Sequence, residues 1–327
     1  MAYQGARTVS AVAVVDLANE MIAGNLISKV ELKALSSDVF YELTLFENNE
    51  AIAEHRLGEE HLIALWNLID AHSDFAFNVG STVNQQAKGI LANWISYSDT
   101  LAQAFDIFTK NVGLLNQAEG WQVVEGETYV ELEFEYQSPY TYANAAIERS
   151  MVAVIAWGNS FVQQPLVIHS ACFSFPEPRH KAKYSALFGN NLTFSSSMNR
   201  IVLLKTQFHQ NLDSANPYLR GVLRERSHAI QSSIDSLTST ASSVTELLAK
   251  DLAYYSAIEN TMMALHMSRA TLYRKLKEHG ITFTALVKQT RIDKLAVLIV
   301  QDSNSEECAQ VLGFSDVSSF YRFRKQL

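Results

Sequence analysis

The stretch that decides the fold of the C-terminal part is residues 258–280, IENTMMALHMSRATLYRKLKEHG. Its pattern predicts a short helix, a turn around His266, and a second helix that opens at Ser268. At about 100° per residue, basic, aromatic and small side chains fall within one arc of roughly 140° on the second helix, whereas Leu272 and Leu276 point away from it. The arc contains Arg269, Ala270, Tyr273, Arg274 and Lys277. Taken alone, this segment fits equally well a helix that enters the major groove of DNA and a solvated basic surface helix.

A second copy of the pattern occupies residues 305–327, SEECAQVLGFSDVSSFYRFRKQL. Here one helix is expected to end at Gly313 and another to start near Asp316. One side of the last helix carries Ser318, Tyr321, Arg322 and Lys325, and the opposite side carries Phe320, Phe323 and Leu327. This repetition favours a pair of DNA-reading helices over a chance basic surface.

Residues 283–301 separate the two copies and carry apolar side chains at helical spacing, namely Leu286, Val287, Leu295, Leu298 and Ile299. A continuous helix over this stretch would be about 28 Å long. One turn of the DNA duplex is about 34 Å. A rigid spacer of this length would place two recognition helices in successive major grooves on one side of the DNA.

Helix starts are predicted by three Ser-x-x-Glu patterns, because the two side chains of a capping box satisfy backbone donors at a helix N-terminus. The pairs are Ser243 with Glu246, Ser256 with Glu259, and Ser303 with Glu306. Just before them, residues 231–243, QSSIDSLTSTASS, are rich in Ser and Thr and are predicted to form a linker. The chain after this linker is therefore expected to be a compact all-helical module.

The net charge of −8 argues at first against a nucleic-acid partner, but the charge is distributed unevenly. Residues 244–327 contain 11 Lys and Arg against 9 Asp and Glu, which leaves 15 against 25 in the rest of the chain. Between residues 265 and 294 the count is 7 basic against 2 acidic. Such a local basic face suits contact with phosphates.

These residues resemble the AraC/XylS-type transcriptional regulators. The resemblance rests on Met267, Ser268, Leu272, Arg274, Leu276, the GITF run at 280–283, Arg291, Ala309 and the LGFSD run at 312–316. It implies two helix-turn-helix units that are joined by a helix and bind promoter DNA. By position, Arg269, Ala270, Tyr273 and Arg274 correspond to the first reading helix, and Val317, Ser318, Tyr321 and Arg322 to the second. Together with the neighbouring Ser268, Lys277 and Lys325, these residues form the expected DNA-binding set. Arg274 and Arg322 are expected to make the strongest contacts, because an arginine guanidinium suits bidentate contact with guanine or with phosphate.

Some positions depart from the family pattern. Met262 stands where relatives have a small alanine, and overfilling a close helix contact costs roughly 1–3 kcal/mol. Ser305 stands where relatives have an apolar residue, Phe320 and Phe323 are spaced by three instead of four, and no Gly and Pro follow Leu327 to close the last helix. These departures are expected to lower the affinity of the second unit more than to change its fold.

The region before the linker is predicted to be α+β. Helical spacing extends from Val12 to about Asn111, with a helix at 51–71 that places Leu57, Leu62, Leu65, Trp66 and Ile69 on one side. A two-residue period then predicts a strand at 130–136, paired as a hairpin with 122–124, followed by a helix at 142–157 and a strand at 166–175.

This region resembles the arabinose-binding-type N-terminal domain of a subset of AraC-type regulators. The matching stretches are SDTLAQAFDIF at 98–108 and FPEPRHKAKYSALFGNNLTF at 175–194. The resemblance implies effector binding, dimerisation or both. The expected organisation is an effector-binding and dimerisation domain at 1–230, a linker at 231–243 and a DNA-binding domain at 244–327.

Catalysis is not expected, since the sequence has no HExxH, paired CxxC, GxGxxG, GxxxxGK[ST] or GxSxG motif. His169 and Cys172 form a lone HxxC that is typical of a strand core, so neither a metal nor a cofactor is expected. Trp94, Tyr97, Trp157, His169 and Phe173 are candidates to line an effector pocket, although aromatic residues at such spacing are more often core, and the effector-binding residues stay unassigned.

A cytoplasmic protein is expected. No export signal is recognised at the N-terminus, and the longest later apolar run, 151–157, is far shorter than the roughly twenty residues needed to span a bilayer. Cys172 and Cys308 are too sparse for a disulfide framework and are expected to be small core residues in a reducing compartment.

The expected function is that of a sequence-specific DNA-binding transcriptional regulator controlled by a small-molecule effector in the N-terminal domain. Its expected partners are double-stranded promoter DNA, the effector, a second copy of the chain in a homodimer and, for an activator, RNA polymerase. The alternative is a protein-interaction module with degenerate helix-turn-helix units that does not bind DNA directly.

Overall fold

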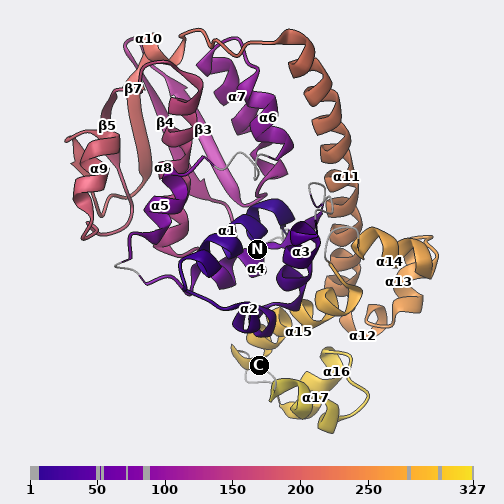
Figure 1. Ribbon diagram of the computed structural model, residues 1–327. Coiled ribbons are helices and arrows are strands. Elements are labelled where there is room, and N and C mark those ends of the chain that lie inside the picture. Colours follow the sequence, from indigo (N-terminus) through magenta and orange to yellow (C-terminus); the bar gives the residue numbers. More distant parts are fainter. Residues whose placement is uncertain are drawn as a thin grey trace. The chain divides into compact units, whose positions relative to one another are not determined.

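The computed structural model describes residues 7–48, 52, 55–70, 73–83, 89–277, 281–300 and 304–325, apart from the side chains of 233, 235–239, 296–297 and 299–300. The chain divides into two compact units, Arg7–Gln231 and Ser232–Leu327 (Figure 1). Several positions used in the sequence analysis lie outside the described residues, namely Ala51, Ala71, Gly280, Gln301, Ser303 and Leu327.

The first unit begins with a helical layer. Its helices are α1 (Ala11–Ala23), α2 (Lys29–Leu35), α3 (Ser37–Glu47), α4 (Glu59–Trp66), α5 (Phe75–Ser81), α6 (Ile90–Ser96) and α7 (Leu101–Asn111), with a 3₁₀ turn at Val112–Leu114. The apolar spacing places Met21, Leu32, Leu43 and Leu65 in one buried cluster. This part confirms the predicted helical region.

The predicted helix at 51–71 is wrong at its start. Leu57 lies in strand β2 (Arg56–Gly58), which pairs antiparallel with β1 (Thr8–Ser10), and α4 begins only at Glu59. The reason is the buried side chain of Arg56, whose guanidinium donates to the carbonyl oxygens of Thr8 at 2.8 Å and Gly113 at 3.0 Å. These long-range hydrogen bonds stabilise an extended backbone that local spacing does not reveal.

A five-stranded sheet follows in the order β3-β4-β7-β5-β6, antiparallel except for the β5–β6 pair. Its strands are β3 (Glu119–Glu125), β4 (Tyr129–Tyr136), β5 (Ile168–Cys172), β6 (Leu192–Thr193) and β7 (Asn199–Leu204). In β4, Val130, Leu132 and Phe134 are buried. The two-residue period and the β3–β4 hairpin are confirmed, and the domain is α+β.

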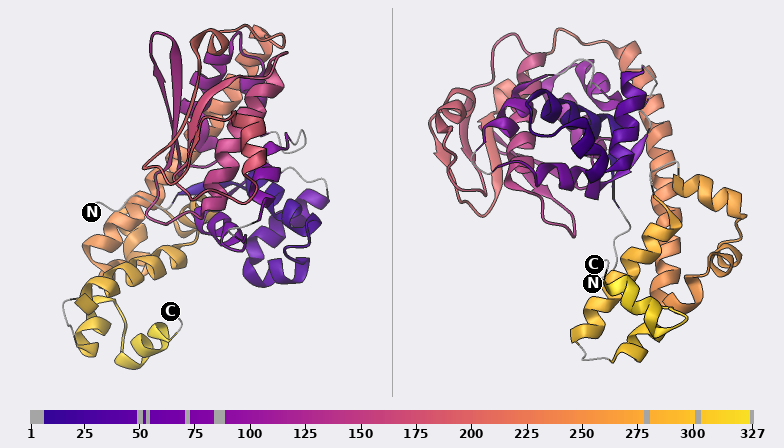
Figure 2. Two further views of the ribbon diagram at one scale, coloured as in Figure 1. Left: turned by 90° about the vertical axis from the view of Figure 1, so that its left-hand side faces the viewer. Right: turned by 60° about the horizontal axis from the view of Figure 1, so that its bottom comes forward.

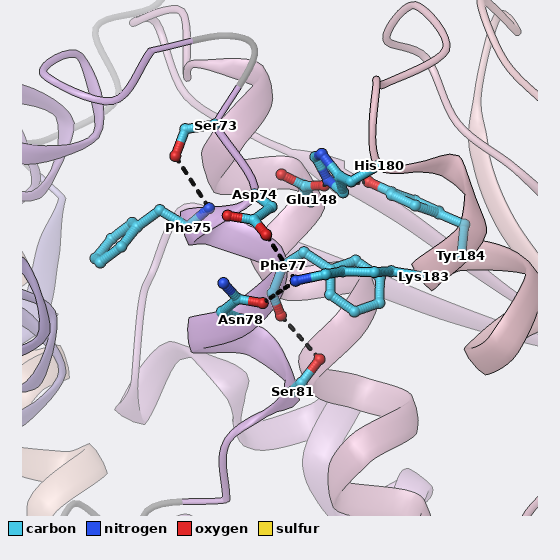
Figure 3. A network of polar contacts seen from close by, with 10 residues as sticks. All are labelled: Ser73, Asp74, Phe75, Phe77, Asn78, Ser81, Glu148, His180, Lys183 and Tyr184. Carbon is cyan, nitrogen blue, oxygen red and sulfur yellow. Dashed lines mark hydrogen bonds and ion pairs between the residues drawn. The ribbon is translucent and has the colours of Figure 1, made fainter. Parts of the chain in front are cut away.

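The helices of the sheet region are α8 (Asn144–Phe161), α9 (Lys181–Phe188) and α10 (Lys205–Phe208). Helix α9 is fastened to its neighbours by polar contacts (Figure 3). Glu148 on α8 accepts a hydrogen bond from Tyr184 and lies 2.7 Å from Nε2 of His180, while Lys183 reaches Asp74 at 2.7 Å. The stretch matched at 175–194 therefore serves to anchor this corner of the first unit.

The second unit is all helical. It contains the later part of α11 (Pro217–Lys250), α12 (Leu252–Tyr255), α13 (Ile258–Ala264), α14 (Arg269–Lys277), α15 (Phe283–Val300), α16 (Ser305–Val311) and α17 (Val317–Arg324). One buried cluster joins these helices, with members such as Leu248, Leu272, Leu276, Leu286, Leu312 and Phe320. Figure 1 and Figure 2 show α13–α14 and α16–α17 as two separate helix pairs of this unit.

Helix starts in this unit differ from those predicted. The predicted linker, residues 231–243, lies inside the continuous helix α11, and so does the predicted cap residue Ser243. The segment is helical because Ala241 and Val244 are buried in the core of this unit. Helix α13 starts after Ala257, and the Ser256 hydroxyl instead donates to the carbonyl of Ala253. Two of the three predicted capping boxes are therefore wrong. The third pattern starts at Ser303, which lies outside the described residues. Asn304 caps α16 by accepting hydrogen bonds from the backbone amides of Glu306 and Glu307.

Candidate functional site

The first helix pair is held by a tight turn between α13 and α14. His266 adopts a left-handed backbone conformation with φ 51°, and the amide of Met267 donates to the carbonyl of Met262 at 3.0 Å. The Ser268 hydroxyl then accepts from the amide of Thr271 at 3.1 Å, which caps α14 as predicted. Leu272 and Leu276 are buried, so the opposite side of α14 faces outward.

The second pair repeats this design with a turn between α16 and α17. Gly313 has φ 70°, and the amide of Phe314 donates to the carbonyl of Ala309 at 2.9 Å. Asp316 caps α17 by accepting from the amide of Ser319 at 2.8 Å, and this hydrogen bond is the main reason that the pKa of Asp316 is lowered. Phe320 fixes α17 to the core.

Arg291 on α15 ties the connecting helix to the second turn. Its guanidinium donates to the carbonyl oxygens of Leu312 at 2.9 Å and Gly313 at 3.1 Å, and it lies over the ring of Phe314 at 4.1 Å. Burial lowers the pKa of Arg291. The carbonyl groups at the end of α16 thereby receive hydrogen bonds from α15. The connecting helix α15 therefore helps to hold the turn between α16 and α17.

Nine of the eleven residues predicted to contact DNA lie on the two helices that follow these turns, Ser268 lies directly before α14 and Lys325 directly after α17. Ten of the eleven are exposed, namely Ser268, Arg269, Ala270, Tyr273, Arg274, Lys277, Ser318, Tyr321, Arg322 and Lys325, whereas Val317 is half-buried and packs against the core. The two tyrosines are accessible to solvent, with Tyr273 46% and Tyr321 52% exposed. Each reading helix therefore presents an arginine and a tyrosine outward.

Local contacts hold some of these side chains in the unbound chain. Arg269 forms an ion pair with Glu259 on α13, Arg322 donates to the Ser319 hydroxyl at 3.0 Å, and the Tyr321 hydroxyl lies 3.0 Å from that of Ser305. Because these contacts are exposed, they are weak and can open for a ligand. They arrange the side chains without burying them.

The first unit contains a cavity of about 150 Å³. Its wall is mostly apolar and aromatic, and includes Trp66, Phe105, Phe108, Trp121, Trp157 and Phe161. Polar side chains from α1, β3, β4 and α8 also line it, among them Asp16, Glu119, Tyr136, Arg149 and Ser150. An apolar cavity with a few converging polar groups is the usual form of a small-molecule site.

The polar groups of the cavity surround Glu119. One carboxylate oxygen accepts from the Ser150 hydroxyl at 3.1 Å and the other from the Trp121 indole at 3.4 Å. Burial raises the pKa of Glu119, and the nearby charge of Arg149 opposes this rise. Burial likewise raises the pKa of Tyr136, whose hydroxyl lies 3.3 Å from that of Ser150.

Comparison with known proteins connects both units to one class of protein. Residues 50–212 match the family described as the arabinose-binding domain of AraC transcription regulator, N-term, and residues 263–327 match a family described as helix-turn-helix domain. The chain belongs to the AraC family of transcription regulators. It is accordingly a regulator and not an enzyme.

Named relatives come from Pseudomonas aeruginosa. The chain is 25% identical to the Ornithine utilization regulator over 251 residues, which are 76% of this chain and 74% of the relative. The crystal structure of transcriptional regulator CdpR superposes with a TM-score of 0.43 at 14% identity, covering 95% of this chain and 93% of that chain.

The departures from the AraC-family pattern have structural explanations. Met262 is only partly buried at the edge of the core, so it does not overfill the contact between α13 and α14. Ser305 donates to or accepts from Tyr321, which gives a polar residue a partner at that position. Phe314 contacts both Phe320 and Phe323, with ring centroids 6.2 Å and 5.3 Å apart, so the spacing of three is accommodated.

The aromatic residues considered for an effector pocket do not gather around this cavity, and Trp94 and Phe173 are buried in the core. Of the five aromatic candidates, Trp157 lines the cavity, whereas Trp94, Tyr97, His169 and Phe173 do not. Glu119 and Arg149 were missed because they are far apart in sequence and no local motif marks them. His169 is exposed, with its ring centroid 4.3 Å from that of Tyr129, so it is not a strand-core residue. Cys172 is half-buried and Cys308 is buried.

Within the described part of the chain, no cluster of His, Cys, Asp and Glu has the geometry to hold a metal ion. Every helix in that part is too short or too polar to cross a lipid bilayer.

Proposed function

We propose that this AraC-family chain recognises specific promoter sequences through α14 and α17, with the eleven exposed or half-buried residues on or directly beside those helices as its DNA-binding set. The observation that supports the proposal is the repeated arrangement of a tight turn, a capped helix and an outward arginine, built twice on one core. Arg274 and Arg322 are the side chains best suited to reading guanine.

The proposal includes control by a small molecule. The cavity of the first unit is its binding site, and the functional domains follow the predicted bounds of 1–230 and 244–327. We place the protein in the cytoplasm as a homodimer, which contacts RNA polymerase if it activates transcription. The name of the Ornithine utilization regulator makes amino acids a sensible first group of effectors to screen.

A salt titration tests whether the partner is DNA. Binding through several phosphates releases counterions, so the affinity of the full chain for duplex DNA from upstream of its own gene should fall steeply and linearly in a plot of log K against log salt. The alternative, a protein-interaction module, would bind this duplex weakly and with no more preference than for an unrelated duplex. That second result would refute the proposal.

A further inference from the structure

We infer that the cavity of the first unit binds a zwitterionic α-amino acid with an apolar side chain, whose ammonium group meets Glu119 and whose carboxylate meets Arg149. This inference rests on the proposed function, because it names the class of effector for a site proposed there. It is carried by the charges and walls of the cavity itself.

The carboxylate of Glu119 favours a cationic group. Its two hydrogen-bond donors, the Ser150 hydroxyl and the Trp121 indole, are neutral, and Arg149 acts on it through charge without a hydrogen bond. A cation in direct contact with this buried carboxylate would stabilise its charged form, which desolvation penalises. A ligand ammonium group supplies that cation.

Arg149 favours an anionic group beside it. Among the residues that the structure describes, none accepts a hydrogen bond from this guanidinium or forms an ion pair with it, although its charge reaches Glu119. A guanidinium presents a planar fork of donors that fits a carboxylate. A ligand with one charge would satisfy either Glu119 or Arg149 and be repelled by the other, whereas a zwitterion satisfies both.

The rest of the cavity selects an apolar side chain. Its aromatic walls include Phe105, Phe108 and Trp157, and its volume is about 150 Å³. An apolar cavity of roughly this volume accepts a benzene-sized group. A sugar, with a hydroxyl on almost every carbon, would leave many hydrogen bonds unmade against such walls. The polarity of the walls therefore favours an amino acid with an apolar side chain over a pentose.

Calorimetric titration of the full chain tests the inference with four probes: L-phenylalanine, 3-phenylpropanoate, 2-phenylethylamine and L-arabinose. The wild-type chain should bind L-phenylalanine at least about tenfold more tightly than either single-charge analogue, since each lost charged contact removes a charge-assisted hydrogen bond. L-arabinose should not compete. Because this series uses the wild-type chain alone, it does not depend on whether variants fold.

Two variants should then give a crossed pattern. Glu119→Gln should weaken the binding of L-phenylalanine but not that of 3-phenylpropanoate. Arg149→Gln should weaken the binding of L-phenylalanine but not that of 2-phenylethylamine. Arg224→Gln, an exposed arginine of α11 outside the cavity, is the matched control and should change nothing.

Tighter binding of L-arabinose or of a single-charge analogue, or no saturable binding of L-phenylalanine, would overturn the inference. DNA binding of the same preparations is measured in parallel. If the wild-type chain binds DNA but not L-phenylalanine, the inference fails while the DNA-binding proposal stands. If the wild-type chain does not bind DNA, the DNA-binding proposal itself is contradicted.

Discussion

At the scale of single residues, the backbone of His266 stores strain that a substitution can release. A side chain with a Cβ in the left-handed region costs roughly 1–2 kcal/mol, and glycine does not carry this cost. We predict that His266→Gly raises the free energy of unfolding by about 0.5–1 kcal/mol, measured by urea denaturation. His266→Ala keeps the Cβ and should give no gain. Equal effects of the two substitutions would contradict this explanation.

The outward residues of α14 and α17 could be predicted from sequence because helical periodicity decides which side chains point away from a leucine or phenylalanine face. The helix starts at Ser268 and Asp316 could be predicted as well, whereas those expected at Ser243 and Ser256 were wrong. A Ser-x-x-Glu pattern also occurs within a helix, as Ser243 shows, and only burial of Ala241 and Val244 decides that α11 continues through it. For the same reason the pair of Glu119 and Arg149 depends on which strand and helix meet, which no local pattern encodes.

At the scale of elements, Gly313 is required by two independent features of the second turn. Its φ is 70°, and a Cβ there would lie 2.8 Å from the Cα of Ala253 on α12. We predict that Gly313→Ala destabilises the second unit by about 2 kcal/mol or more, as measured by chemical denaturation. The matched control is Gly221→Ala within α11, where a Cβ meets nothing within 4 Å.

The control substitution should have the opposite sign. Alanine in a helix interior is favoured over glycine by about 0.5–1 kcal/mol, so Gly221→Ala should stabilise the chain. No loss of stability in Gly313→Ala would show that the turn geometry is not as described, and a loss in Gly221→Ala would contradict the open helical position described for Gly221.

The cap of α17 should make this helix sensitive to acid. The hydrogen bond from the Ser319 amide lowers the pKa of Asp316 from its ordinary value of 3.8. A lowered pKa in the folded state stabilises the fold above the ordinary pKa, and this contribution is lost as the pH falls through the folded value. The difference in Tm between the wild type and Asp316→Asn should therefore shrink as the pH falls from about 6 to about 3. A difference that stays constant across this range would argue against an ionised cap.

At the scale of the whole molecule, the two units carry separate chemistries. The second unit presents basic, exposed helices, whereas the first unit encloses a mostly apolar cavity that is lined by two carboxylates, Asp16 and Glu119, and one guanidinium, Arg149. Composition alone hides this division, because the acidic first part sets the net charge of −8. Counting charge by segment indicated the basic character of the second unit, and local charge is what phosphate contact depends on. It gave no indication of the cavity in the first unit.

The most direct test of the account is fluorescence anisotropy of the full chain with duplex DNA from upstream of its own gene. Substituting Arg274 or Arg322 with Ala should weaken binding by about 1–3 kcal/mol for each true base contact. Lys110→Ala removes one exposed positive charge from the first unit and should leave the affinity unchanged. Unchanged affinity in both Arg274→Ala and Arg322→Ala would contradict the central claim that α14 and α17 read the DNA.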